Sequence, residues 1–458
     1  MPGGNFNKRI GKDRPGTYIN YESTNAGNIP DNDLGVVLIP LAGHGYGPHK
    51  EFITIDNTAP DAQLSKLGYS IFDDNPDMLL IREAFKRSQR VVVYIPNQGE
   101  RAAATQGSLK AAARYGGARG NALRFSAAAN PIKGFDATIF LDTQTMSSYE
   151  RLETISDLIA QDDAWIEFSL AAPSGDSLLP LEEVAGVNLE GGTNGTLSAG
   201  DIADFFEASE GARWRTMAFP FEPSGESGDV IPGLQAALLT KIKYLREEMG
   251  RYRKAVMVKF DADYEGIVNV TNSVVLENGV KLSIAQATAW VAGADAGASN
   301  TQSNTYMAYE GAVGIVGAKG HEEAILAIRN GEFFFSMSEQ GEVIAEYDIN
   351  SLVTFGFPKD KTWRKNRVLR VHDSFAEAVM QEFPPNRFNN NPEEWDVMEG
   401  LGGALLMRFQ DEGAIKNADY STDFLVDREA SGGESVYFNV GLQAVDSAEK
   451  LFFTIRTR

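Results

Sequence analysis

The chain has 458 residues, of which 43% are hydrophobic and 10% aromatic, so it can bury several cores and we expect roughly two to four domains. Its formal net charge of −21, from 63 acidic and 42 basic residues, disfavours binding to the phosphate backbone of nucleic acids. The chain has no cysteine, no apolar run near the roughly 20 residues of a membrane helix, and no signal peptide in residues 1–16. These features predict a globular protein made in a reducing cytoplasm, without disulfides, thiolate sites or membrane insertion.

Residues 33–96 alternate between strand and helix patterns. An apolar strand followed by a glycine-rich turn occupies 33–48, and "EFITID" at 51–56 alternates as a second strand does. Helical spacing follows at 76–88, and the continuous Val/Ile run at 90–96 is typical of a strand that is covered on both faces. This order predicts an α/β unit.

The composition changes between about 99 and 192, where Gly, Ala and Ser are frequent and short segments alternate, as in "FDATIFLDT". Short strands with turn signals between them predict a small antiparallel sandwich. The segment "SSYERLETISDLIAQ" at 147–161 predicts one helix that interrupts it.

The α/β pattern resumes from 197. Helices are expected at 197–208, 230–249, 283–293 and 320–331, and strands at 254–260, 266–271 and 332–338. The α/β patterns before residue 98 and after residue 195 are therefore compatible with one domain that contains the sandwich as an insertion.

The last hundred residues show a third sequence pattern, with two helices followed by strands. A Ser374-x-x-Glu377 capping box predicts a helix at 373–383, and a second helix covers 392–410, although its three glycines each weaken it by roughly 1 kcal/mol. Strands follow at 435–443 and at the terminal "KLFFTIRTR". The basic segment "KDKTWRKNRVLR" at 359–370 is either a solvated loop that leads into a strand or a contact patch for an acidic partner.

Two segments resemble ligand-binding loops without completing them. The glycine-rich "GHGYGPHK" at 43–50 lacks the Lys-Ser/Thr pair of a phosphate loop, so a turn is expected. Asp261, Asp263 and Glu265 reproduce the first half of a calcium loop, but Asn272 stands where a bidentate Glu is required. A β-turn and a weak ion site both remain open there.

No active site emerges from the residues. The four histidines, at positions 44, 49, 321 and 372, fall in neither a zinc helix nor a nucleophile motif, and no G-x-S-x-G elbow occurs. We therefore predict no catalytic, cofactor-binding or metal-binding residues, and a protein that is not an enzyme.

Seven segments, in chain order, resemble the contractile tail sheath proteins of bacteriophages, in particular those of phages and phage-tail-like particles of Gram-positive bacteria. The segments are "RPGTYINYES" (14–23), "YGGARGNALRFS" (115–126), "LEGGTNGTLSAGDIADFFEA" (189–208), "AWVAGADAGASNTQSNTYMAYEGAVGIVGA" (289–318), "NGEFFFSMSEQGEVIAEYDINSLVTF" (330–355), "KNRVLRVHDSFAEAVMQEF" (365–383) and "VGLQAVDSAEKLFFTIRTR" (440–458). Together they span nearly the whole chain.

The resemblance implies an α/β multidomain fold. Its discontinuous subtilisin-like α/β core would occupy 33–98 and 195–349, with an antiparallel β-sandwich inserted at 99–194. An α+β assembly domain would occupy 350–458 and form with both chain ends, while 1–32 would be an N-terminal arm. A subtilisin-like fold does not by itself bring protease activity.

The resemblance also implies that both chain ends exchange strands with neighbouring subunits, because unpaired edges supply main-chain hydrogen bonds to another copy. The residues expected in these intersubunit arms are Tyr18, Ile19, Asn20, Tyr21, Leu451, Phe453 and Ile455. The alternative is that both strands pair within their own subunit.

The function implied is that of a structural subunit, assembled into helically stacked hexameric rings around a tail tube, which contracts to drive the tube through a cell envelope. Its partners would be other copies, the tube protein, and the baseplate and tail terminator proteins. It would lie in the virion tail after assembly in the host bacterial cytoplasm. Without a nucleotide motif, the work must come from stored conformational energy.

The region 350–458 is expected to face the tube. Its candidate tube contacts are Lys359, Lys361, Arg364, Lys365, Arg367 and Arg370. Two rival functions remain open, namely a hydrolase on a subtilisin-like core and a non-contractile lattice protein such as a capsid or surface-layer subunit.

Overall fold

The computed structural model describes residues 3–4, 17–18, 35–172, 177–357 and 359–456. The chain divides into two compact units, Met1–Asp33 and Leu34–Arg458. In the first unit, β1 (Gly3–Gly4) pairs in parallel with β2 (Thr17–Tyr18). Among the helices of the described residues, none has the length and apolar character that crossing a bilayer requires.

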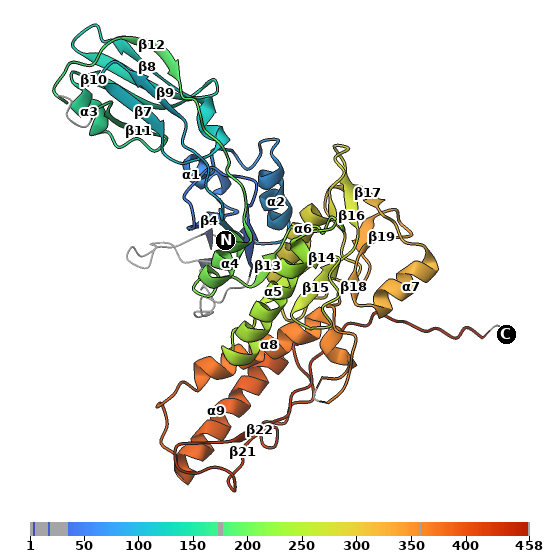
Figure 1. Cartoon of the computed structure of the whole chain (residues 1–458). Helices are drawn as coiled ribbons and strands as arrows, with labels where there is room; N and C mark the ends of the chain where they lie inside the picture. The colour runs from blue at the N-terminus through green and yellow to red at the C-terminus, as the bar shows by residue number, and fades with distance from the viewer. Residues whose placement is uncertain (1–2, 5–16, 19–34, 173–176, 358, 457–458) are drawn as a thin grey trace. The chain divides into compact units, whose positions relative to one another are not determined.

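The second unit is built on a seven-stranded sheet (Figure 1). In sheet order its strands are β18 (Glu332–Phe333), β15 (Ile267–Val270), β14 (Lys254–Val258), β13 (Thr216–Ala218), β3 (Val36–Pro40), β5 (Arg90–Tyr94) and β4 (Phe52–Asp56). All neighbours are parallel except β4, which runs antiparallel to β5 at one edge. Strands from both sides of the 99–192 region therefore share one sheet, joined where Thr216 pairs with Val37.

Helices cover both faces of this sheet, which explains its uninterrupted Val/Ile strands. Alternate strand residues point to opposite faces. One face packs against α2 (Pro76–Phe85) and α6 (Ile284–Gly297), and the other against α4 (Ala199–Ala208) and α5 (Ile231–Lys243). One π-helical turn, Tyr244–Glu248, continues α5.

Residues 102–189 form two antiparallel sheets around a hydrophobic core of their own. The first sheet has the order β10–β9–β8–β12 and the second has the order β11–β7–β6. Their bounds are β6 (Ala103–Gln106), β7 (Leu109–Ala113), β8 (Leu123–Ala129), β9 (Phe135–Leu141), β10 (Gln144–Leu152), β11 (Ile166–Leu170) and β12 (Val184–Asn188).

The helix predicted at 147–161 is wrong in its first half. Residues up to Leu152 belong to β10, because Ser147, Ser148 and Tyr149 pair with β9. Only α3 (Ile155–Ile159) is helical, and it begins at a capping box in which Thr154 and Asp157 exchange hydrogen bonds.

Shorter elements complete the α/β part. β16 (Ser273–Leu276) pairs with β17 (Ala312–Val316), and β19 (Phe335–Met337) pairs with β20 (Val343–Ala345). This part also contains α7 (His321–Arg329), α1 (Leu64–Leu67) and the 3₁₀ turn η1 (Pro60–Gln63). Of the other 3₁₀ turns, η2 (Ala118–Ala122) lies within the 102–189 region and η4 (Lys361–Arg364) directly precedes residue 365.

The C-terminal residues pack two long helices, α8 (Asn366–Glu382) and α9 (Pro392–Asp411), against the hairpin of β21 (Phe424–Val426) and β22 (Phe438–Val440) (Figure 1). Their shared core contains Phe375, Leu406, Phe409 and Phe424. The helix predicted at 392–410 is confirmed despite its glycines.

The capping box predicted at Ser374 is wrong. α8 begins eight residues earlier, at Asn366, because the basic segment continues the apolar stripe with Val368 and Val371. Ser374 therefore lies inside the helix, where its Oγ donates to Asn300 Oδ1 at 2.9 Å. The Glu377 carboxylate instead accepts two hydrogen bonds from Arg215 Nη1, each at 2.8 Å.

Buried ion pairs attach α8 to the sheet. Asp295 on α6 accepts hydrogen bonds from Lys254 Nζ at 2.5 Å and Thr216 Oγ1 at 2.7 Å, and Arg370 of α8 lies 3.5 Å from it. One turn further along α8, Asp373 receives two bonds from Arg246, at 2.7 and 3.0 Å. These charges are nearly inaccessible to water, so each depends on its partner.

The Asp295 carboxylate is held ionised. Burial by itself raises its pKa, but Lys254 and Arg370 lower the pKa to about 2. Because the folded-state pKa lies below the unfolded value of 3.8, the stabilisation is complete above about pH 4 and is lost as the pH falls through about 2.

We predict that Asp295→Asn lowers the free energy of unfolding at pH 7 by about 3–5 kcal/mol, because Lys254 and Arg370 keep their buried charges without a counter-ion. The variant should also lose the part of the acid dependence between pH 4 and 2 that Asp295 supplies. Urea unfolding at several pH values measures both effects. The control is Glu153→Gln, which breaks an exposed pair with Lys133 and should change stability by less than about 1 kcal/mol.

Two glycines of α9 provide a matched pair for a second prediction. A Cβ at Gly402 would overlap the ring of Phe424, whereas a Cβ at Gly400 would meet nothing. Gly402→Ala should therefore destabilise the protein by about 1–3 kcal/mol, and Gly400→Ala should stabilise it by up to about 1 kcal/mol through helix propensity. Chemical unfolding of both variants checks the opposite signs; equal effects would contradict the close packing of Phe424 on Gly402.

Candidate assembly surfaces

The C-terminal segment exposes a cluster of apolar side chains. Leu451, Phe452, Phe453 and Ile455 are 66%, 91%, 82% and 86% exposed. The described residues 445–456 form neither helix nor strand, and Figure 1 shows the last part of this described segment running outward. Single exposed apolar residues are common, but four within five positions are typical of a contact surface.

This cluster includes Phe452, which the predicted apolar row of Leu451, Phe453 and Ile455 omits. In a strand, Phe452 would point to the face opposite to that of Leu451, Phe453 and Ile455. In the structure, the side chains on both faces of this segment are exposed to solvent. The sequence "LFFTI", in which three apolar residues stand together, was the signal that could have identified it. The pairing of this segment within its own subunit, the alternative left open by the sequence, does not occur in the described residues 451–456.

The residues just before this cluster are fixed to the body. Glu449 forms an ion pair with Lys365 and accepts a hydrogen bond from Thr305 Oγ1 at 2.8 Å. Arg367 Nη1 donates to Ser447 Oγ at 2.7 Å, and Asp446 lies 3.5 Å from Lys365 Nζ. The chain is therefore anchored up to Glu449, whereas no side-chain hydrogen bond or ion pair holds the described residues 450–456.

The N-terminal arm is described at few positions. Thr17 and Tyr18 form β2, whose register pairs Tyr18 with Gly4. Ile19, Asn20 and Tyr21 lie outside the described residues.

The β21–β22 hairpin offers an open sheet edge. It contains only two strands in the described part of the chain, with Leu425 paired to Asn439 at its centre. Leu425, Tyr437 and Val440 are between 38% and 55% exposed. A two-stranded sheet is marginally stable alone, and its outer edges carry main-chain groups that can pair with another strand.

Four of the six cations predicted as tube contacts are engaged within the chain. Arg370 is buried beside Asp295, Lys365 pairs with Glu449, and Lys359 reaches Glu265 at 2.5 Å. Arg367 donates to Ser447. The segment 359–370 therefore does not present a continuous basic face; it folds as η4 and the start of α8, not as a loop that leads into a strand.

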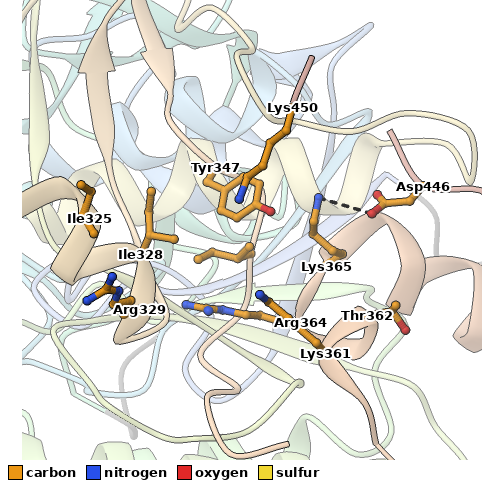
Figure 2. A pocket seen from close by; sticks show the side chains of 11 residues that line it. Ile325, Ile328, Arg329, Tyr347, Lys361, Thr362, Arg364, Lys365, Asp446 and Lys450 are labelled. Carbon is orange, nitrogen blue, oxygen red and sulfur yellow. Dashed lines mark ion pairs between the residues drawn. The ribbon is translucent and has the colours of Figure 1, made fainter. Parts of the chain in front are cut away.

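The remaining two, Lys361 and Arg364, have no ion pair or side-chain hydrogen bond within the described residues. Lys361 is exposed, while Arg364 is only 8% exposed. Both line a groove beside the exit of the C-terminal segment (Figure 2).

The three acidic residues of the calcium-like segment 261–265 each make separate contacts within the chain. Asp261 accepts from Asn269, Asp263 accepts from the Val353 and Thr354 amides, and Glu265 pairs with Lys359. Among the described residues, no cluster of three or more His, Asp or Glu side chains could hold a metal ion. The loop is thus a turn stabilised by side-chain contacts.

Three of the four histidines, at positions 44, 49 and 372, have local packing partners, whereas His321 is exposed at the start of α7. His44 Nε2 lies 2.7 Å from the Leu67 carbonyl and its Nδ1 lies 3.3 Å from Asp77. His49 contacts the Pro96 carbonyl, and His372, within α8, lies against the ring of Trp363. The glycine-rich 43–50 segment is a turn, as predicted.

Comparison with known proteins gives consistent matches along the chain. The family model of the phage tail sheath protein central domain matches residues 195–351, and that of the phage tail sheath C-terminal domain matches residues 358–458. The protein XkdK of the phage-like element PBSX of Bacillus subtilis is 31% identical over 476 residues, covering 99% of each chain.

Two solved structures extend these matches to three dimensions. The sheath tail protein of Desulfitobacterium hafniense is 33% identical, with a TM-score of 0.79 over 97% of this chain and all of that one. The contracted helical sheath of the anti-feeding prophage has a TM-score of 0.55 over 98% of this chain and 100% of its own. Its identity of 11% shows a common fold alone.

Proposed function

The chain belongs to the phage tail sheath protein family, and from this membership we propose that it polymerises into helically stacked hexameric rings around a tail tube and contracts to drive the tube through a cell envelope. The protein is a structural tail sheath subunit, as the matched families and relatives are, and not an enzyme. The hydrolase alternative is thereby set aside.

The main support for the proposal is the exposed C-terminal segment at 451–456. Four exposed apolar side chains follow directly after an anchored stretch ending at Glu449, and the described residues 450–456 belong to no strand. Such a segment gains free energy by adding as a strand to another subunit, which satisfies its main-chain hydrogen bonds and buries its apolar side chains. At the other end, Tyr18, Ile19, Asn20 and Tyr21 are proposed to add to another subunit as well, with Tyr18 giving up its parallel pairing with Gly4.

The hairpin edge at β22 is the acceptor that this chain offers. Its exposed Tyr437 and Val440 can pack against apolar residues of an arriving arm. Each subunit would then be both donor and acceptor, and repeated head-to-tail contacts of this kind build a helical array.

Contraction requires two lattice arrangements of similar free energy. Strand links between rigid bodies can act as hinges, because the main-chain ladder persists while the bodies reorient. A difference of only a few kcal/mol per subunit, multiplied over many copies, then supplies the work without nucleotide hydrolysis.

The domain bounds, the surface that faces the tube and the further partners are proposed from the resemblance to the sheath family. The division into 1–32, 33–98 with 195–349, 99–194 and 350–458, and the subtilisin-like character of the sheet, stay predictions. So does the tube-facing position of 350–458, for which Lys361 is the most accessible of the candidate cations. Baseplate and tail terminator proteins would bound the sheath, and assembly would occur in the host cytoplasm before incorporation in the virion tail.

We predict that the concentrated protein forms hollow striated tubes in negative-stain electron microscopy. A wide lumen would identify a contracted lattice, and addition of tube protein should produce a second, longer axial spacing. One unchanging spacing under both conditions would favour the non-contractile lattice protein. Monomers under all conditions of salt and tube protein would contradict the proposed assembly.

Removal of either arm should abolish assembly and leave the subunit folded. Deletion of residues 451–458 should not change the melting temperature, because the described part of this segment is exposed, and deletion of 1–23 should likewise leave a folded monomer. Phe72→Ser provides the control, since this exposed phenylalanine lies outside both arms. Normal sheaths from either deletion would refute the strand-exchange model.

A further inference from the structure

A groove of about 540 Å³ lies between α7, η4 and the start of the C-terminal segment. Figure 2 shows Arg329, Arg364 and Lys361 on one side of it and Lys450 above Tyr347. Ile325, Ile328 and Ile349 supply its apolar lining. The groove therefore combines an apolar wall with a group of cations.

Arg364 is the unusual member of this group. Its side chain is more than nine-tenths buried, yet its Nε and Nη2 atoms have no hydrogen-bond partner within the described residues. Burial lowers the pKa of this guanidinium, as expected for a desolvated cation. A buried, unpartnered charge is costly, so its retention points to a partner outside the subunit.

The neighbouring charges do not neutralise Arg364. Arg329, Lys361 and Lys450 are exposed and have no ion pair with any described residue. Asp446, the carboxylate lining the groove, is turned toward Lys365, 3.5 Å away (Figure 2). Three cations around a desolvated guanidinium create a local positive field in a chain whose net charge is −21.

We infer that this groove binds an acidic segment of a second copy of this chain, with one carboxylate received by Arg364. A planar guanidinium can hold a carboxylate through two parallel hydrogen bonds. Lys361 and Lys450 would flank further acidic side chains, and apolar side chains of the same segment would lie on Ile328 and Tyr347.

A second copy is the occupant that the chain's own chemistry favours. Each copy carries 63 acidic residues, so acidic segments are abundant on any neighbour in an array. The groove borders Lys450, where the C-terminal segment departs, and so it adjoins the strand exchange proposed above. The apolar lining suits a peptide better than a small ion. This inference rests on the proposed assembly, in which copies meet at this end of the molecule.

The first test is Arg364→Met, which keeps an apolar stem and removes the charge. The melting temperature of the unassembled protein should stay equal or rise, because an unpaired buried charge is lost. The critical concentration for assembly should rise about tenfold or more. The control Lys110→Met removes an exposed cation on β7 and should change neither quantity. A lowered melting temperature with unchanged assembly would assign Arg364 a purely structural role.

The second test identifies the occupant. Sheaths assembled from a mixture of ¹⁵N-labelled and unlabelled protein are treated with a carbodiimide, which joins only amines and carboxylates in contact. Links from Lys361 or Lys450 to Asp or Glu peptides of the other isotope are expected. Links to tube protein in assembled tails, or links only within one copy, would overturn the inference.

Three other results would distinguish a small-ion site, a failure of the groove inference alone and a failure of the proposed function. If citrate or phosphate raises the melting temperature of the wild type but not of Arg364→Met, and mixed-isotope links are absent, the groove is a small-ion site. If the wild type forms sheaths and Arg364→Met forms them equally well without such links, only the groove inference fails. If the wild type does not associate at all, the proposed function fails with it.

Discussion

The buried carboxylate of Asp295 is the contact on which the arrangement of the C-terminal region depends. It lies on the helix α6, within the sheet's apolar layer, and binds Lys254 of β14 while Arg370 approaches it from α8. Buried ion pairs add little net stability, but they penalise every arrangement that separates the partners. Asp373 and Glu377 extend the same pattern along α8. The helix is therefore fixed in position and rotation.

This fixed helix determines where the surfaces for assembly lie. Lys365 and Arg367 at its start hold Glu449 and Ser447, so the last anchored residues of the chain are defined by α8. The apolar segment after Glu449 then leaves from a rigid origin. A strand that departs from a defined point loses less entropy on pairing than a fully flexible tail does. The groove at Arg364 is positioned by the same segment.

The excess of acidic residues explains why most of the basic side chains in the 359–370 segment are paired within the chain. In a chain with 42 basic and 63 acidic residues, most cations of the 359–370 segment are engaged by carboxylates or hydroxyls of the same chain. Lys361 and Arg364 are the two that are not engaged within the described residues. Contacts between like-charged subunits require such local exceptions, because the general field opposes association.

The periodic elements and the family can be predicted from the order of the amino acids. Runs such as 90–96 and 254–260 predict buried strands, and the apolar stripe of 230–249 predicts α5, because these patterns depend only on which faces are covered. Residue types also exclude the common catalytic and metal motifs. The resemblance of seven segments indicates a tail sheath protein, which the family and structural matches confirm.

The roles of the charged residues, in contrast, depend on the folded chain. Ser374 and Glu377 have the spacing of a helix start, yet they lie inside α8, because the residues before them pack on the same core. Arg370 and Arg364 look alike in a basic run, but one is paired with a carboxylate 75 residues away and the other has no partner in the described chain. Long-range contacts between polar side chains leave no periodic trace in a sequence, whereas apolar burial does.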